Sequence, residues 1–265
     1  MDPEPVRGIV IAPMSLGEVV DSGFTLARRN FRYLVGIGAW GIAVGYLLDA
    51  LLSIPTADFR STTGAAMTNF VSGIGAGMAG IAIMHACARL IDPADSPGRV
   101  TAGEAYRYAL NRLPTLIGLI IVIFFASIPM LILFPVGVYV WVRWTISANA
   151  AIVERVGPIA ALKRSWALTH GAWWHTLIVL IISGLAVGII EAVVAGVLGA
   201  AIAAGSFALN TPVLFVLGNA IVGSVLAIVV TPFPTAVGIV LYYELRARSE
   251  GFDLERRMLQ AAPAA

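Results

Sequence analysis

Three ionisable residues lie within long apolar stretches of the chain and are the residues best placed for charge chemistry: Asp49, Arg143 and Glu191. A charged side chain at the centre of a bilayer costs about 2.5 to 3.5 kcal/mol on insertion scales unless it is paired or hydrated. At about 1.5 Å of rise per residue, all three fall in the outer half of the predicted membrane segments. We therefore expect Arg143 to pair with Asp49 or Glu191, either as a structural ion pair or beside a path for an ion or solute. Asp49 has the further alternative of reaching outward to the interface.

The rest of the chain has no residue set with the spacing of a catalytic or metal site. It contains no phosphate-binding Gly-Lys-Ser loop, no Gly-x-Ser-x-Gly nucleophile motif and no His-Glu-x-x-His motif. His170 and His175 are five residues apart, which is the wrong interval for two ligands on one helix face. The single Cys87 lies in an apolar run and is expected to be a small buried hydrophobe. We expect no enzymatic activity, no cofactor and no bound metal.

Composition and charge distribution indicate an integral membrane protein. Apolar residues make up 59% of the chain and charged residues 12%, and the mean hydropathy is +0.89. All but two of the 17 basic residues fall into four short clusters between long apolar stretches. The clusters are Arg7, Arg28, Arg29 and Arg32; Arg89, Arg99, Arg107 and Arg112; Arg155, Lys163 and Arg164; and Arg246, Arg248, Arg256 and Arg257. Basic residues at the ends of apolar helices favour anionic lipid as a partner and make nucleic acid an unexpected one.

Six apolar stretches are long enough to cross a bilayer as helices. They are about Tyr33 to Ile54, Phe70 to Leu90, Leu113 to Leu133, Val136 to Val153, Ala172 to Ala200 and Val213 to Tyr243. All four basic clusters then lie on one side, which the positive-inside rule makes cytoplasmic. The prediction is an all-α, polytopic transmembrane helical bundle in the cytoplasmic membrane, with both termini inside. Pro232 and Pro234 should kink the last segment, and the alternative is a separate short or re-entrant element from Thr235 to Arg246.

Three of the basic segments resemble one unit, an amphipathic interfacial helix that precedes a membrane segment. Ser15-Leu16-Gly17-Glu18 and Thr101-Ala102-Gly103-Glu104 both have the pattern of a capping box, and Pro158 to Trp166 occupies the same place in the third unit. We expect three pseudo-repeats of an interfacial helix plus a helical hairpin. They form a single transmembrane domain at 15–250, between an N-terminal tail at 1–14 and a cytoplasmic C-terminal tail at 251–265.

The cytoplasmic helices should form a collar of basic and aromatic side chains at the headgroup layer. Two interpretations stay open: the collar only anchors the helix ends, or it binds anionic lipid or a partner protein. The residues expected to contact headgroups, which we call the collar, are Arg28, Arg29, Arg32, Lys163, Arg164, Trp173 and Trp174.

Small residues recur at every fourth position in the fifth membrane segment: Gly184, Gly188, Ala192 and Gly196. Such a flat face allows helices to approach closely where lipid provides no hydrophobic drive. We expect this face to pack within the chain, and homodimerisation through it is the alternative.

Several segments together are similar to one family. They are Met14 to Glu18, Arg28 to Phe31, Ala160 to Trp166, and the tail from Leu241 to Arg248 into Glu250 to Leu254. On these residues the chain resembles the membrane domain associated with glycerophosphoryl diester phosphodiesterases, a polytopic helical domain found mostly in prokaryotes. Glu244 stands where the family pattern leads us to expect Asp. Some members are fused to a soluble barrel that hydrolyses glycerophosphodiesters and takes about 250 residues, and we expect the 265 residues here to contain no such barrel.

Two classes of function follow from these features. The first is a non-catalytic membrane module that organises lipid or a partner protein through the collar. The second is a small transporter or channel with a path near Asp49, Arg143 and Glu191, favoured by the kinked last segment and the repeats. The absence of a polar stripe along the apolar segments favours the module, which is our prediction.

Overall fold

The computed structural model describes residues 13–54, 62–92, 99–132 and 134–250, and within these ranges it is helical and contains no strand. The helices are α1 (Leu16–Arg29), α2 (Phe31–Ser53), α3 (Thr62–Ile91), α4 (Ala102–Ile132), α5 (Phe134–Trp144), α6 (Ser147–Val153), α7 (Pro158–Leu168), α8 (Trp173–Ala208), α9 (Pro212–Val230) and α10 (Pro232–Glu250). Six helical stretches are long and apolar enough to cross a membrane. The predicted all-α bundle with six membrane segments is therefore confirmed.

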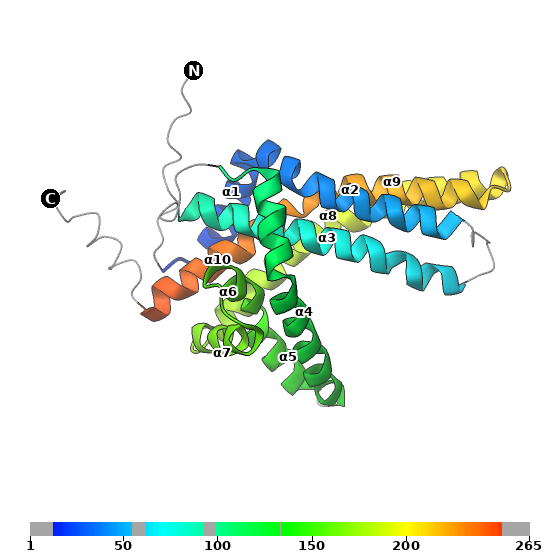
Figure 1. Ribbon diagram of the computed structural model, residues 1–265. Coiled ribbons are helices and arrows are strands. Elements are labelled where there is room, and N and C mark those ends of the chain that lie inside the picture. Colours follow the sequence, from blue (N-terminus) through cyan, green and yellow to red (C-terminus); the bar gives the residue numbers. More distant parts are fainter. Residues whose placement is uncertain (1–12, 55–61, 93–98, 133, 251–265) are drawn as a thin grey trace, which may run out of the picture.

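The helices form two arms that diverge from one densely packed end (Figure 1). In the four-helix arm, α2 packs against α3 and α9, and α8 packs against α9. The hairpin arm consists of α4 and α5 and runs away from the first arm. The packed end contains α1, α6, α7 and α10 together with the adjoining ends of the long helices.

Helix α10 is the centre of the packed end. Its side chains Val237, Leu241 and Leu245 are buried, and α1 covers one side of it through Val19 and Leu26. Burying a large aliphatic side chain contributes about 1.5 to 3 kcal/mol, so α10 supplies much of the stability of this end. The polar face of α1 is left outward.

The sixth membrane segment is kinked at Pro232, because Thr231 before it keeps helical dihedrals and the helix continues on both sides. Helix α9 ends at Val230 and α10 begins at Pro232, whose missing N–H is tolerated at the first turn of a helix. The predicted kink at the prolines is therefore present, and the helix runs on to Glu250, beyond the predicted end at Tyr243.

The fourth membrane segment is divided, which the sequence did not predict. Helix α5 has only 11 residues, and at about 1.5 Å per residue this is roughly half of a bilayer core of about 30 Å. A turn at Thr145 and Ile146 then leads into α6.

The interfacial helices differ from one another. Helix α1 starts with the predicted capping box, in which Ser15 N–H donates to Glu18 Oε2 at 2.7 Å. Hydrogen bonds from the backbone and side chain of Ser15 lower the pKa of Glu18. Thr101 and Glu104 form the same box at the start of α4. Helices α1 and α7 are separate from the following span, whereas α4 continues through Pro114 into its membrane segment without a break. The second interfacial helix is thus part of a span.

The small-residue face of α8 does not pack within the described residues. Gly184, Gly188, Ala192 and Gly196 are exposed, and no described atom lies within 4 Å of a Cβ built at any of the three glycines. The expectation of intramolecular packing is wrong because α8 meets α9 through another face, where a Cβ at Gly218 would lie 2.7 Å from Ile202 Cγ2. Homodimerisation through this face stays a prediction.

Close helix approach occurs instead between α2 and α3. A Cβ built at Gly75 would lie 2.4 Å from the carbonyl oxygen of Gly41 and 2.7 Å from Gly45 Cα. Both contacts are with backbone, which cannot rotate away as a side chain can. The pairing of α2 with α3 therefore depends on the absence of a side chain at residue 75.

We predict that Gly75→Ala destabilises the protein by about 1 to 3 kcal/mol, the usual cost of overpacking. Gly77→Ala on the same helix is the matched control, because the described structure has no atom within 4 Å of a Cβ there. The control should be neutral or stabilising by up to about 1 kcal/mol, since Ala favours helix over Gly. Reversible unfolding in micelles measures both changes, and equal effects would contradict the close approach of α2 and α3.

Candidate functional site

Arg143 is buried beside α7, away from both acidic residues with which the sequence predicted a pair. Its Nη2 and Nε atoms donate to the hydroxyl of Tyr139 at 2.7 and 3.2 Å, and Nη1 donates to the carbonyl oxygen of Trp166 at 3.0 Å. The guanidinium carbon also lies 5.2 and 4.8 Å from the ring centroids of these two residues. The expected pair with Asp49 or Glu191 is therefore wrong, because hydrogen bonds and cation–π contacts near the end of α5 already use the guanidinium group.

Asp49 and Glu191 lie in the four-helix arm, on α2 and α8. Tyr46 is within electrostatic range of both carboxylates, and Ser72 of α3 hydrogen-bonds to Asp49. Among the residues that the structure describes, neither acid is in an ion pair. The two acids thus share one region of the arm without the cation that the sequence assigned to them.

Most of the collar is exposed to the surroundings of the packed end. Arg28, Arg29, Arg32 and Lys163 are exposed, and Trp174 is 69% exposed. These side chains are free to meet headgroups.

Two collar residues are instead engaged within the protein. Arg164 Nε donates to Glu154 Oε1 at 2.6 Å, and its Nη1 pairs with Glu250. Burial disfavours the charged form of Arg164, but the hydrogen bonds to Glu250 and Glu154 outweigh burial and raise the pKa of this residue. Trp173 stacks on Tyr139 at 5.7 Å and donates from Nε1 to its carbonyl oxygen at 3.1 Å. Both side chains thus join parts of the packed end, and their contact with headgroups stays a prediction.

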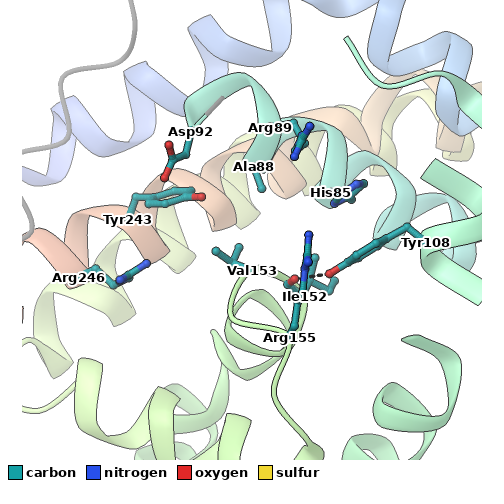
Figure 2. A pocket seen from close by; sticks show the side chains of 10 residues that line it. All are labelled: His85, Ala88, Arg89, Asp92, Tyr108, Ile152, Val153, Arg155, Tyr243 and Arg246. Atoms are coloured by element: carbon teal, nitrogen blue, oxygen red, sulfur yellow. Dashed lines mark hydrogen bonds between the residues drawn. The ribbon is translucent and has the colours of Figure 1, made fainter. Parts of the chain in front are cut away.

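A polar pocket of about 170 Å³ lies at the packed end, where α3, α4, α10 and the segment after α6 meet (Figure 2). Three arginines from separate parts of the chain line it: Arg89 of α3, Arg155 after α6 and Arg246 of α10. Asp92 is the only carboxylate among the described lining residues, and Tyr108 is one of two lining tyrosines. The pocket is therefore cationic.

The pocket wall is held by contacts between distant segments. The Tyr108 hydroxyl donates to the carbonyl oxygen of Ile152, and the Tyr108 ring stacks on His85 with centroids 3.8 Å apart. Arg155 follows with φ of 56°, a left-handed conformation that costs a non-glycine residue about 1 to 2 kcal/mol. This turn carries the Arg155 side chain toward Arg89 and His85, as Figure 2 shows.

Ion pairs beside the pocket fix α10 to α6 and α7. Glu154, which follows α6, accepts from Tyr242 at 2.7 Å and from Arg164. Glu250 pairs with Arg246 at 3.2 Å and with Arg164. Alternating charges of this kind hold the pocket residues of α10 in position.

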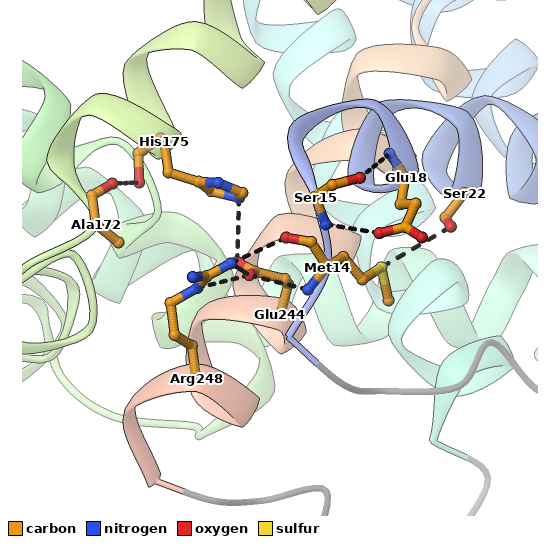
Figure 3. Close-up of polar contacts among 9 residues, drawn as sticks. Met14, Ser15, Glu18, Ser22, Ala172, His175, Glu244 and Arg248 are labelled. Carbon is orange, nitrogen blue, oxygen red and sulfur yellow. Dashed lines mark hydrogen bonds and ion pairs between the residues drawn. The ribbon is translucent and has the colours of Figure 1, made fainter.

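A second polar cluster joins the two ends of the described chain (Figure 3). Glu244 is completely buried, and its Oε1 accepts from Arg248 Nε at 2.8 Å and from the Met14 N–H at 3.4 Å. His175 Nε2 lies 3.5 Å from Glu244 Oε2, and Arg248 donates to the Met14 carbonyl oxygen at 2.9 Å. Glu244, the position where the family resemblance led us to expect Asp, therefore connects α10 to α8 and to the residues before α1.

The cationic pocket was missed by sequence reasoning. Arg89, Arg155 and Arg246 were recognised only as members of three basic clusters that mark one side of the membrane. Their convergence depends on how α3, α6 and α10 pack, and no spacing in the sequence reports that.

We predict that Arg143→Ala lowers the stability by about 1 to 3 kcal/mol, because buried acceptors lose their donor. In double-mutant cycles it should couple to Tyr139→Phe by about 0.5 kcal/mol or more and be additive with Asp49→Asn or Glu191→Gln. Unfolding in micelles gives each free energy. Coupling of Arg143 to Asp49 or Glu191, together with no coupling to Tyr139, would contradict the contacts described here and support the ion pair predicted from the sequence.

Comparisons of the chain with protein-family models, with curated proteins and with solved structures give no match. The resemblance to a phosphodiesterase-associated membrane domain therefore stays a prediction.

Proposed function

We propose that the protein is a non-catalytic, multi-pass module of the cytoplasmic membrane that organises anionic lipid, or a partner protein, around its packed end. In this proposal the packed end faces the cytoplasm and both termini lie on that side. The resemblance to a polytopic membrane domain supports the same proposal and transfers no phosphodiesterase activity to these residues.

The observation that carries the proposal is that four basic collar residues are exposed and unpaired within the described ranges. Arg28, Arg29, Arg32 and Lys163 are exposed and have no ion-pair partner within the described ranges, whereas Arg164 is held by two carboxylates. A basic side chain near an anionic membrane surface contributes about 1 kcal/mol of attraction. Four such side chains at one end therefore favour anionic lipid there.

The orientation of the collar helices supports this role. Helix α1 buries its apolar face against α10, which turns Arg28 and Arg29 outward. Trp174 is exposed at the start of α8, and exposed tryptophans are typical of the interface between lipid and water. Basic and aromatic side chains thus occur together where a headgroup layer requires them.

A transport path past Asp49, Arg143 and Glu191 is the alternative function. Its support has weakened, because Arg143 is bound to Tyr139 and Trp166. The remaining support is the common environment of Asp49 and Glu191 around Tyr46. The module is the better supported of the two.

Single cysteines placed in a Cys87→Ala background test the proposed orientation of the protein in the membrane. Ala208→Cys, at the end of α8, should react with an impermeant maleimide added to intact cells, and Ala160→Cys, on α7, should react only after the membrane is opened. Both native residues are exposed on the protein, so accessibility of the thiol depends on the side of the membrane. Labelling of residue 160 from outside would overturn the orientation.

We predict that changing Arg28, Arg29, Arg32 and Lys163 together to Gln lowers the ratio of phosphatidylglycerol to phosphatidylethanolamine that co-purifies with the protein. The physical reason is the loss of about 1 kcal/mol of attraction per residue. Lipid mass spectrometry measures the ratio, and enrichment in the unchanged protein should fall as salt rises.

The matched control keeps the charge at all four positions by exchanging Arg for Lys and Lys for Arg. It should retain the enrichment, because attraction to a lipid surface depends on charge rather than on the geometry of one side chain. An unchanged lipid ratio in the Gln variant would show that the collar only sets topology.

A further inference from the structure

Among the described residues that line the pocket at the packed end, arginines outnumber carboxylates. Arg89, Arg155 and Arg246 line it, with Asp92 as the only carboxylate among the described lining residues. Arg246 also pairs with Glu250 at 3.2 Å, and Arg164 pairs with both Glu250 and Glu154. When these three neighbours are added to the described lining residues, four arginines face three carboxylates. Because charges in a concave site with protein walls are less screened than charges on a flat surface, this excess attracts an anion.

The type of cation indicates the type of anion. A guanidinium group presents planar pairs of N–H donors that match the oxygens of phosphate and carboxylate groups. A carboxylate offers two oxygens in one plane, whereas the three arginines reach the pocket from three segments, α3, α10 and the chain after α6 (Figure 2). A tetrahedral group, with oxygens in several directions, fits this arrangement better.

The pocket is also large enough. Its volume of about 170 Å³ is far above the ~15 Å³ that a single water molecule needs. A phosphate group with a small substituent can therefore enter without displacing the wall.

Capping of helix ends does not account for all three arginines. Arg89 lies in the last turn of α3 and Arg155 follows α6, so each is near a helix C-terminus that attracts cations. Arg246 lies a full turn before the end of α10, yet it lines the same pocket. Arg155 also occupies a left-handed backbone conformation, with φ of 56°, of the kind that is retained at binding sites.

We propose that this pocket binds a phosphate group, carried either by a lipid headgroup or by inorganic phosphate. The site is separate from the collar, because no exposed collar residue lines it. The lipid source rests on the proposed placement of the packed end at the headgroup layer, whereas the phosphate site itself does not.

The first experiment uses the full-length protein in phosphatidylcholine nanodiscs with a graded fraction of phosphatidylglycerol, and the detergent-solubilised protein with radiolabelled inorganic phosphate. We expect saturable binding of about one inorganic phosphate per chain. The double variant Arg89→Gln with Arg155→Gln should bind at least about tenfold more weakly, since each lost charge-assisted hydrogen bond alone accounts for such a factor. Circular dichroism and thermal unfolding establish that the variant is folded.

Two controls separate the pocket from general charge. Arg107→Gln removes an exposed arginine on α4, next to Tyr108 in sequence but outside the pocket lining, and should bind normally. The double variant Arg89→Lys with Arg155→Lys keeps the charge but loses the planar donor pairs, and it should lose binding, whereas charge-conserving exchanges in the collar are tolerated.

If the double variants do not fold, protection of the unchanged protein decides the matter. Phosphate or phosphatidylglycerol should slow the modification of Arg155 by phenylglyoxal, read by peptide mass spectrometry, and leave Arg107, which is outside the pocket lining, unprotected. If phosphatidylglycerol competes with inorganic phosphate, the site binds a lipid headgroup. If inorganic phosphate binds and phosphatidylglycerol does not, the site binds a soluble phosphate. The proposal is overturned if the Gln variant binds as well as the unchanged protein, or if neither binding nor protection is observed. Neither result bears on the proposed function of the collar, because the collar variants leave the pocket residues unchanged.

Discussion

The burial of α10 is the interaction on which the rest of the structure depends. This helix lies among α1, α3, α6 and α8, and its apolar side chains join those of its neighbours in one continuous core. The kink at Pro232 marks the change from α9, which belongs to the arm, to α10, whose side chains belong to this core. Tyr242, which donates to Glu154, and Arg248, which donates to the Met14 carbonyl oxygen, then hold α10 to its neighbours by polar contacts.

The arms are built on a different principle from the packed end. Of the most apolar window of α8, only 11% is buried within the protein, and in the hairpin arm Phe124 and Phe125 are 61% and 64% exposed. Lipid chains solvate such surfaces as well as another helix does, so only local features such as the glycines of α2 and α3 bring helices together there. The packed end is richer in polar groups, and ion pairs and hydrogen bonds join its helices there.

The sequence predicted those parts of the structure that depend on local physics. Apolar length and charge clustering located the six membrane segments, and the capping boxes at Ser15 and Thr101 are present. Contacts between residues far apart in the sequence were not predictable. Arg143 was expected to pair with an acid, on the assumption that only an opposite charge can stabilise a buried guanidinium group. In the structure a tyrosine hydroxyl, a backbone carbonyl and two aromatic rings stabilise it. The packing of the small-residue face of α8 was predicted wrongly, and the pocket was missed, for the same reason. Neither a helix face nor a basic cluster indicates by itself which part of the chain it will contact.

The tie between Met14 and Glu244 joins residues 230 positions apart. Closing so long a loop carries an entropic cost that local contacts do not offset. During synthesis α1 therefore emerges first and waits with Val19, Leu26 and Ala27 uncovered until α10, the last described helix, has been made. An amphipathic helix with an uncovered apolar face has affinity for a membrane surface, so we expect the bilayer to cover this face of α1 until α10 replaces it.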